Sequence, residues 1–427
     1  MEQKVIKDSL LGEYTYAVLD NDLKVFVMEK PEFSGTYAIF GTRYGSIDTK
    51  FSKNGEKEIN VPEGIAHFLE HKLFESEDGD AFTKFAATGA YANAFTSFDR
   101  TCYLFSCSKN FEENLDILLS FVQAPFFTEQ TVSKEQGIIG QEIRMYLDSP
   151  PWRVLFNMLE NMYEEHPVKI DIAGTEKSIS QIDAKLLYQC YNTFYNPANM
   201  FICIAGNVKV NQVLEKIKAS TKPCEKIEIT RGEFKETKKV KSNYVSQNLE
   251  VASPLFCLGY KEILDSNIAT VKERIVADML LEILCGECSP LYRKLTDEGL
   301  INDEFSAEYF VGNGYSCFMI DGESSSPKRI RDEVEKEIFR LTQEGIDSEL
   351  FEAVKKSAYG DAVKRFDSNE SIVMGMVDCA INGGNLFEQT KILKEISSED
   401  IIHRLKTLDK DSSVLSVILP QKESLNV

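Results

Sequence analysis

The order of helix and strand patterns occurs twice along this chain, and this repeat constrains the fold more than any other feature of the sequence. Residues 182–205 and residues 398–419 each read as a helix, a turn and an apolar strand. Ahead of both segments, strand-like and helical patterns follow one another in a similar order. With 427 residues, the chain is also too long for one simple core. We therefore predict an α+β fold built from two similar halves, not a short-period solenoid.

The predicted domains are a first half at residues 1–222, a connecting segment at 223–250 and a second half at 251–427. The connecting segment is rich in Lys and Glu and has few regularly spaced apolar residues, which is typical of a linker. Strands are expected at residues 23–28, 37–40, 101–107, 200–205, 255–260 and 316–320. Helices are expected at residues 112–122, 132–147, 271–284, 330–342 and 348–366.

The charge balance limits the classes of partner. The chain has 68 acidic and 48 basic residues and a net charge of −20. Such a protein repels nucleic acid and anionic membrane surfaces, so neither is expected as a partner. The N-terminus has no signal-peptide pattern, and no run of 18 apolar residues is present. Ten scattered cysteines indicate reduced thiols, so a cytoplasmic location is expected.

The motif with the clearest chemistry is His67-Phe68-Leu69-Glu70-His71, which contains two of the four histidines of the chain. On a helix, residues four apart lie on one face, so His67 and His71 can bind one Zn²⁺, with Glu70 projecting nearby. The pattern H-x-x-E-H is the inverzincin signature. We expect Pro62 and Glu63 to begin this helix. The alternative is an ordinary amphipathic helix with two surface histidines.

A catalytic zinc site needs a third protein ligand, with water in the fourth position. The best candidate is Glu142, which lies in a segment with helical periodicity that ends before Pro150 and Pro151. Glu135 lies seven residues earlier, almost two helical turns, and so shares a face with Glu142. The alternative is that both are solvated glutamates on an exposed helix face, where Glu is most often found.

These motifs resemble the M16 (pitrilysin-type) zinc peptidases. The chain is most similar to their short, bacterial, processing-peptidase-like members, and among these to the zinc-motif-bearing chain of a two-chain pair in Gram-positive bacteria. Members of this family pair H-x-x-E-H with a distant glutamate, and Glu142 lies 71 residues after His71. The likeness covers most of the chain and is strongest in residues 20–210. It extends to the segments Gly89–Ser97, His166-Pro167, Gly174-Thr175 and Tyr195–Met200.

The resemblance implies a zinc-dependent endopeptidase that cleaves peptides or unfolded segments. It implies one Zn²⁺ per chain, with His67, His71 and Glu142 as ligands. Glu70 would be the general base, and Glu135 would assist from beside the ligands. It also implies two α/β-sandwich halves that face each other across a chamber, with the second half as a non-catalytic wall. The predicted peptide-binding edge strand consists of Asn93, Ala94, Phe95 and Thr96, although the residues alone would favour a plain strand or turn.

One departure from the family pattern concerns the second half. Active members place an Arg and a Tyr there, where this chain has Thr296 and Asn302. Tyr292 and Arg293 lie just upstream but at a different spacing, so whether either one substitutes stays open. We therefore expect a related companion chain, without the zinc motif, to supply the Arg/Tyr pair in a heterodimer. The alternatives are a structural subunit and a peptide-binding protein that holds zinc without turnover.

Overall fold

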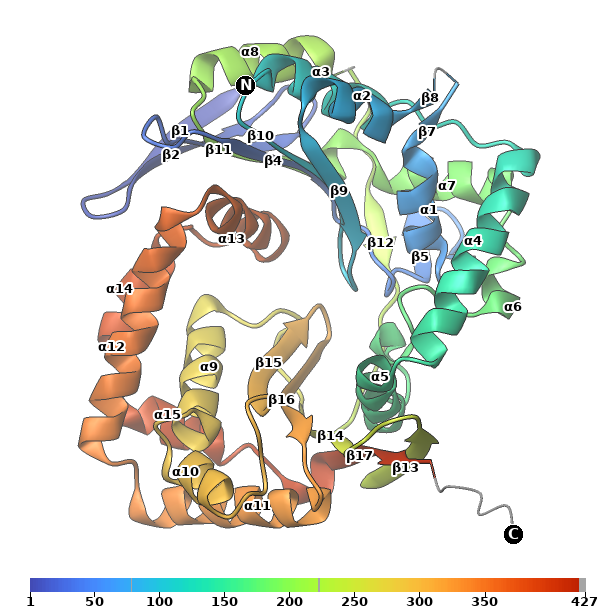
Figure 1. Ribbon diagram of the computed structural model, residues 1–427. Helices are drawn as coiled ribbons and strands as arrows, with labels where there is room; N and C mark the ends of the chain where they lie inside the picture. Colours follow the sequence, from blue (N-terminus) through green and yellow to red (C-terminus); the bar gives the residue numbers. More distant parts are fainter. Residues whose placement is uncertain (78, 222, 422–427) are drawn as a thin grey trace. The chain divides into compact units, whose positions relative to one another are not determined.

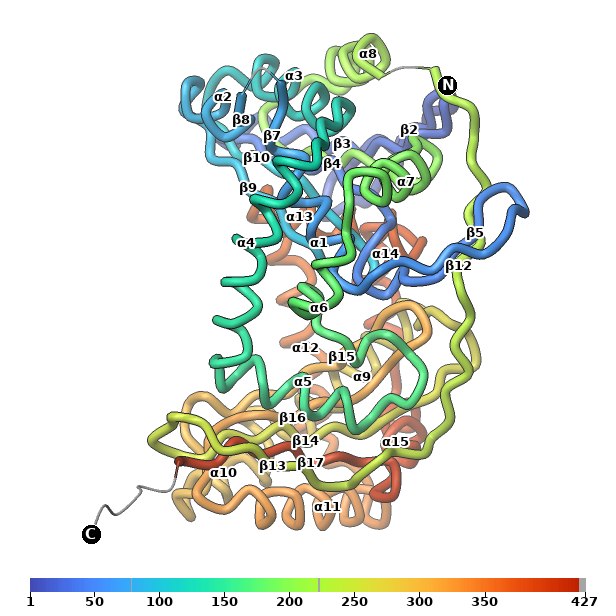
Figure 2. The backbone as a smooth tube through the Cα atoms, turned by 90° about the vertical axis from the view of Figure 1, so that its right-hand side faces the viewer, coloured from blue at the N-terminus to red at the C-terminus, as the bar shows by residue number. Residues whose placement is uncertain are grey.

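The computed structural model describes residues 1–77, 79–221 and 223–421 (Figures 1 and 2). Residues 222 and 422–427, which end two of the predicted domains, lie outside the described residues. The chain forms two compact units. The first consists of residues 1–143, 171–233 and 363–387, and the second of residues 144–170, 234–362 and 388–427.

The first unit is built on a seven-stranded sheet in which β9 forms one edge and β1 the other. All of its strands pair antiparallel except β3 and β11, which are parallel. In sheet order, the strands are β1 (Glu2–Asp8), β2 (Gly12–Val18), β3 (Lys24–Glu29), β11 (Met200–Gly206), β4 (Thr36–Thr42), β10 (Thr101–Cys107) and β9 (Tyr91–Thr96). Smaller sheets are formed by β5 (Lys50–Lys53), β6 (Ile59–Asn60) and β12 (Ile229–Arg231), and by β7 (Glu75–Ser76) and β8 (Gly79–Asp80).

Helices cover both faces of this large sheet. The helices of the unit are α1 (Ile65–Leu73), α2 (Ala81–Thr88), α3 (Phe111–Val122), most of α4 (Glu129–Leu147), α6 (Glu176–Ile179), α7 (Ala184–Phe194), α8 (Val210–Ser220) and α13 (Asn369–Asn382), with the 3₁₀ helices η2 (Pro197–Asn199) and η3 (Arg365–Asp367). Figure 1 shows α2, α3 and α8 on one face of the sheet and α13 on the other. Buried side chains of α13, among them Val373, Met376 and Val377, pack against Ile39 and Phe201 of the sheet.

The second unit is built on a five-stranded sheet with β13 and β15 at its edges. In sheet order, the strands are β13 (Tyr244–Leu249), β17 (Ser413–Pro420), β14 (Leu255–Glu262), β16 (Tyr315–Glu323) and β15 (Ser306–Gly312). Its helices are α5 (Pro150–Met162), α9 (Val271–Cys285), α10 (Pro290–Asp297), α11 (Pro327–Glu344), α12 (Ser348–Lys364), α14 (Glu388–Glu395) and α15 (Ser398–Leu405), with η1 (Pro167–Lys169) and η4 (Lys410–Ser412).

The element order confirms the predicted α+β fold with two similar halves. The series α1, α2, β9, β10, α3 and α4 of the first half recurs as α9, α10, β15, β16, α11 and α12 in the second. All predicted strands and helices are present, with small shifts at their ends. All ten cysteines are free. None of the helices in the described part of the chain combines the length and hydropathy needed to span a membrane.

The compact units, however, do not follow the linear order of the sequence, because each sheet is covered by a helix from the other half. Helix α5 belongs to the first half of the sequence but packs against β14 and β17 in the second unit. A Cβ atom on Gly259 would lie 2.5 Å from Met162 Cε, so the absence of a side chain in β14 lets α5 approach. Conversely, α13 completes the core of the first unit. The linear domain boundaries therefore stay a prediction about the sequence repeat.

The segment at residues 223–250 is more than a linker. Its start supplies β12, which pairs with β5 in the first unit. Its end supplies β13, which pairs parallel with β17 in the second unit. Both strands are short edge strands with partly exposed residues, so they lack the apolar alternation by which a strand is identified in a sequence.

Candidate metal centre and active site

Helix α1, which carries the H-x-x-E-H motif, begins at Ile65. The prediction that Pro62 and Glu63 open the helix is wrong. Gly64 precedes the helix with φ of 85°, a conformation that favours glycine, and thus separates those residues from it. A Cβ atom on Gly64 would also lie 2.3 Å from the carbonyl oxygen of Ala173, so the loop approaches the helix start too closely for a side chain.

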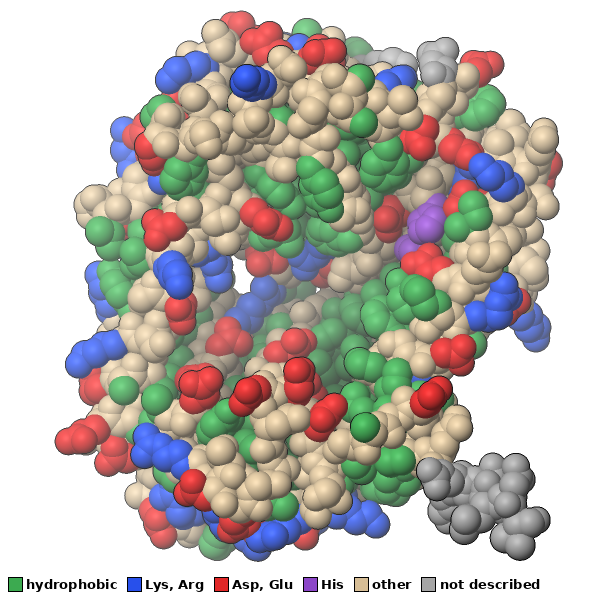
Figure 3. Space-filling view, in the orientation of Figure 1, with side chains coloured by type: hydrophobic (Ala, Val, Ile, Leu, Met, Phe, Trp, Pro, Cys, Tyr) green, Lys and Arg blue, Asp and Glu red, His purple; other side chains and the backbone are tan. Residues whose placement is uncertain are grey.

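His67, His71 and Glu142 lie together. Each offers one ligand atom, and these atoms all lie within 4.8 Å of one another. The two Nε2 atoms are 3.2 Å apart, and oxygens of Glu142 lie 3.7 Å from Nε2 of His67 and 3.6 Å from Nε2 of His71. Figure 3 shows histidine side chains beside acidic side chains where α1 lies in Figure 1. Among the described residues, this is the one such group of metal-ligand side chains.

The donor set fits a divalent cation. Nδ1 of His71 lies 3.0 Å from a carboxylate oxygen of Glu135, so this nitrogen carries the proton and Nε2 presents a lone pair to the cluster. Burial, reinforced by the charge of His71, lowers the pKa of His67 to about 3, so His67 is neutral. Two imidazoles and one carboxylate are ligands that Zn²⁺ prefers.

The carboxylates come from α4, as their seven-residue spacing predicts. Val132, Ile139 and Ile143 form the buried side of the helix. Glu135 is only 6% exposed, and Glu142 is half-buried. The alternative interpretation, two solvated glutamates on an exposed face, is therefore wrong.

Opposing effects act on His71. Burial is the largest single effect and lowers its pKa. The hydrogen bond with Glu135 and the negative charges of Glu70, Glu135 and Glu142 together outweigh burial, and the pKa of His71 is raised. The carboxylates thus create a negative field at the ligand cluster, which favours a bound cation.

Glu70 is held next to the ligands by β9. Burial raises the pKa of Glu70, and hydrogen bonds from Thr96 oppose this shift. The Thr96 hydroxyl donates to Oε2 of Glu70 at 2.6 Å. A carboxyl group in such an environment is a candidate acid or base.

Strand β9 contains the four predicted peptide-binding residues and lies at the sheet edge, as predicted. Asn93 is exposed, and its side-chain oxygen accepts a hydrogen bond from the backbone N–H of Ala94 at 2.9 Å. Its side-chain nitrogen donates to the hydroxyl of Tyr91 at 3.2 Å. Phe95 packs against the core formed with α13. The Ala94 N–H thus belongs to the unpaired edge and is covered by the Asn93 amide.

In the second unit, the positions of the missing Arg/Tyr pair have short polar side chains. Thr296 is exposed near the end of α10. The Asn302 amide donates to Glu323 at 3.1 Å. Tyr292 is half-buried against the core of the second unit, with its ring 5.9 Å from that of Phe305, while Arg293 is exposed.

Sequence reasoning missed Lys72, which directly follows His71. Its side chain is fully buried in the first unit and forms an ion pair with Glu75, which also lies 3.5 Å from Lys134 of α4. A lysine within the apolar pattern of a motif helix was the available signal, because Lys is almost never buried without a partner.

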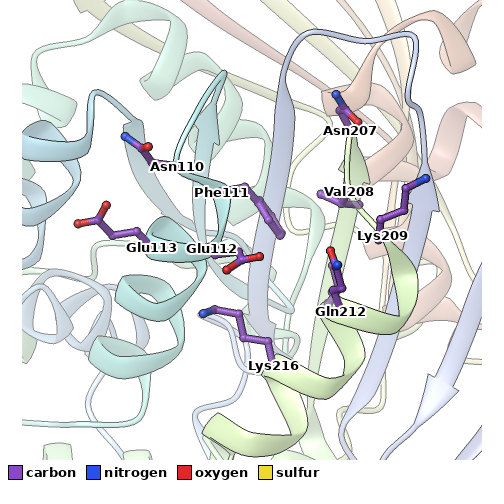
Figure 4. A pocket seen from close by; sticks show the side chains of 10 residues that line it. Asn110, Phe111, Glu112, Glu113, Asn207, Val208, Lys209, Gln212 and Lys216 are labelled. Atoms are coloured by element: carbon purple, nitrogen blue, oxygen red, sulfur yellow. The ribbon is translucent and has the colours of Figure 1, made fainter.

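A cavity of about 460 Å³ lies elsewhere in the first unit, at the N-terminal ends of α3 and α8 (Figure 4). Its lining mixes both charges, including Glu112, Glu113, Lys209 and Lys216. It includes none of the predicted site residues, so we assign the chemistry to the cluster on α1 and α4.

Comparisons with known proteins agree with these features. Residues 56–176 match the family described as insulinase (peptidase family M16), and residues 181–358 match the peptidase M16 inactive domain. YmfH of Bacillus subtilis (strain 168), an uncharacterized zinc protease, is 42% identical over 389 residues, which cover 90% of this chain and 91% of YmfH. YmxG of the same organism, also an uncharacterized zinc protease, is 26% identical over 82% of this chain and 84% of its own length.

Solved structures share the architecture. The crystal structure of an M16-like peptidase from Alicyclobacillus acidocaldarius has a TM-score of 0.93 and 34% identity, and covers 97% of this chain and 100% of that chain. A protease from Helicobacter pylori has a TM-score of 0.83 at 19% identity, with 95% of this chain and 99% of that chain covered, and shares the fold.

Proposed function

Since this chain belongs to the M16 family of peptidases, we propose that it is a zinc-dependent endopeptidase that cleaves peptides or unfolded segments. One Zn²⁺ per chain is held by His67, His71 and Glu142. The observation that carries the proposal is that the ligand atoms of these three side chains lie within 4.8 Å of one another, although Glu142 lies 71 residues after His71. The names of YmfH and YmxG as zinc proteases support it.

Each residue of the site has a separate chemical role. Zn²⁺ bound at this site would supply a Lewis acid that lowers the pKa of a water molecule. Glu70 accepts the proton of the attacking water and returns it to the leaving amine. Its Oε2 accepts the Thr96 hydroxyl, and the carboxylate keeps further lone pairs that can take the proton. Glu135 fixes the ring of His71 through the contact at Nδ1.

The peptide binds in an extended conformation along β9. Asn93, Ala94, Phe95 and Thr96 supply this edge, to which a peptide adds by main-chain hydrogen bonds. The edge position of β9 and the short distance from Thr96 to Glu70 support this placement. Recognition of this kind depends on an extended backbone more than on sequence, so the substrates are peptides or unfolded segments.

A companion chain completes the enzyme. Thr296 and Asn302 stand where active relatives have Arg and Tyr, and neither can stabilise the charge that develops on the substrate carbonyl oxygen as a cation does. Loss of one such donor typically costs 10²–10³-fold in rate. We propose that a related chain without the zinc motif supplies the pair in a heterodimer, and that cleavage occurs in an enclosed chamber in the cytoplasm.

The second candidate is a catalytically silent, peptide-binding or structural subunit. The absence of the Arg/Tyr pair at the expected positions favours it. The presence of all the zinc-motif residues, together with a half-buried Glu70 that accepts the Thr96 hydroxyl, favours the peptidase.

Metal analysis and peptide hydrolysis test the proposal together. The purified chain should contain about one Zn²⁺, and Glu142→Gln should remove tight binding. Quenched, unstructured peptides should be cleaved by the chain with its companion, and a chelator should abolish cleavage. A zinc-free chain, or a zinc-loaded pair that hydrolyses none of the peptides, would reject the peptidase.

A further inference from the structure

Thr96, the half-buried last residue of β9, contacts the proposed base. Its hydroxyl lies 2.6 Å from Oε2 of Glu70, a short distance typical of a charge-assisted hydrogen bond. The Thr96 hydroxyl, which could otherwise bind a peptide, is therefore directed to Glu70.

The single hydroxyl proton of Thr96 has one acceptor. The Thr101 hydroxyl lies 3.4 Å from that of Thr96, at the facing position of β10. Thr101 donates its own proton to the backbone carbonyl of Tyr44 at 2.9 Å. The longer contact between the two hydroxyls leaves the Thr96 proton to Glu70, which lies 0.8 Å closer and is the stronger acceptor.

Two positions on the edge of β9, Ala94 and Thr96, therefore have different partners. The Ala94 N–H is covered by the exposed Asn93 amide, which a peptide carbonyl can replace. At Thr96, the side-chain hydroxyl is bound to Glu70, which is half-buried. A peptide added along β9 therefore reaches Ala94 and ends beside Glu70.

We propose that Thr96 is a positioning residue that holds the carboxylate of Glu70 from the end of the peptide-binding strand. It refines the predicted role of Thr96, which was direct contact with the peptide. It rests on the proposed function, in which Glu70 is the base. The same strand then binds the peptide backbone and orients Glu70, the group that activates water for attack on the peptide.

Kinetics separate positioning from peptide contact. Thr96→Val keeps the shape of the side chain and removes the hydroxyl, and Thr96→Ser keeps the hydroxyl. Misplacing a catalytic group by about 1 Å can cost 10²-fold. In the zinc-loaded heterodimer, we expect Thr96→Val to lower kcat about 10- to 100-fold with KM unchanged, and Thr96→Ser to stay within about threefold of the parent chain.

Thr101→Val is the matched control, because it removes the facing hydroxyl, which does not touch Glu70. Its kcat per zinc-loaded, folded molecule should equal that of the parent chain. A Thr96→Val variant with raised KM and unchanged kcat would overturn the proposal, because the hydroxyl would then bind substrate.

A measurement without turnover keeps the inference separate from the proposed function. In the zinc-free chain, Thr96→Val should lower the thermal midpoint by about 3 °C or more. In a Glu70→Ala background, the same change should lower it by less than about 1 °C, because the hydroxyl has lost its acceptor. Equal shifts in both backgrounds would overturn the Thr96–Glu70 pair. If no variant or parent chain shows turnover, the proposed function fails, while this comparison still decides whether Thr96 holds Glu70.

Discussion

Glu135 should control zinc affinity without touching the metal. Its carboxylate oxygen lies 3.0 Å from Nδ1 of His71, and the residue is only 6% exposed, so water cannot easily replace it. Loss of such a partner typically costs 10- to 100-fold in metal affinity. Glu135→Gln can still accept one neutral hydrogen bond, and we expect about tenfold weaker binding, or about 1.4 kcal/mol. Glu135→Ala leaves Nδ1 of a half-buried ring without this partner, and we expect about 100-fold weaker binding, or about 2.7 kcal/mol.

The assay is competition for Zn²⁺ against a chelator of known affinity, with the fraction of metal-loaded chain measured at equilibrium. Glu142→Gln, which removes a direct ligand, should lose more affinity than either Glu135 variant. Glu129→Gln is the matched control, because Glu129 is an exposed residue of the first turn of the same helix. Unchanged affinity in Glu135→Ala, or equal losses in Glu135→Gln and Glu142→Gln, would refute the division between ligand and supporting residue.

Three further predictions concern stability and dynamics. Burial lowers the pKa of His166 to about 4, so the unfolded state takes up a proton first as pH falls below about 6.5. The free energy of unfolding, measured by chemical denaturation, should therefore fall by about 3 kcal/mol between pH 6.5 and 4. His166→Asn should make the free energy of unfolding less dependent on pH in this range. Asn93→Ala uncovers the Ala94 N–H and should speed its amide exchange, and an unchanged rate would contradict the observed cap. Met376→Ala, in a fully buried position of α13, should destabilise the first unit by about 2–5 kcal/mol. Amide exchange should then lose protection in β4 and β11, and a loss confined to β14 and β17 would contradict the packing of α13 in the first unit.

The two halves of the ligand cluster could be predicted separately because each depends on spacing within one helix. Helical spacing alone places His67 and His71 on one face, and the seven-residue spacing does the same for Glu135 and Glu142. That these two faces meet could not be derived from spacing and came from the family resemblance. The start of α1 was predicted wrongly because Pro62 and Glu63 have the ordinary composition of a first turn. The controlling residue was Gly64, whose close approach to Ala173 depends on a segment more than 100 residues away.

The exchange of helices between the two units could not be predicted for a related reason. Helices α5 and α13 were not among the predicted helices, and periodicity does not say which sheet an apolar helix face covers. That choice depends on complementary surfaces, such as the space above Gly259 that admits Met158 and Met162. The Thr96–Glu70 hydrogen bond is equally non-local, since it requires the position of β9 relative to α1.

The central claim is that this chain uses a zinc site and Glu70 to hydrolyse peptides with a companion chain. The most direct test compares the parent chain with Glu70→Gln, each loaded with zinc and mixed with the related chain, on a quenched, unstructured peptide of about 20 residues. Both forms should bind one Zn²⁺ with similar affinity, and Glu70→Gln should cleave the peptide at least about 10²-fold more slowly. Equal turnover by the two forms at equal zinc content would contradict the claim.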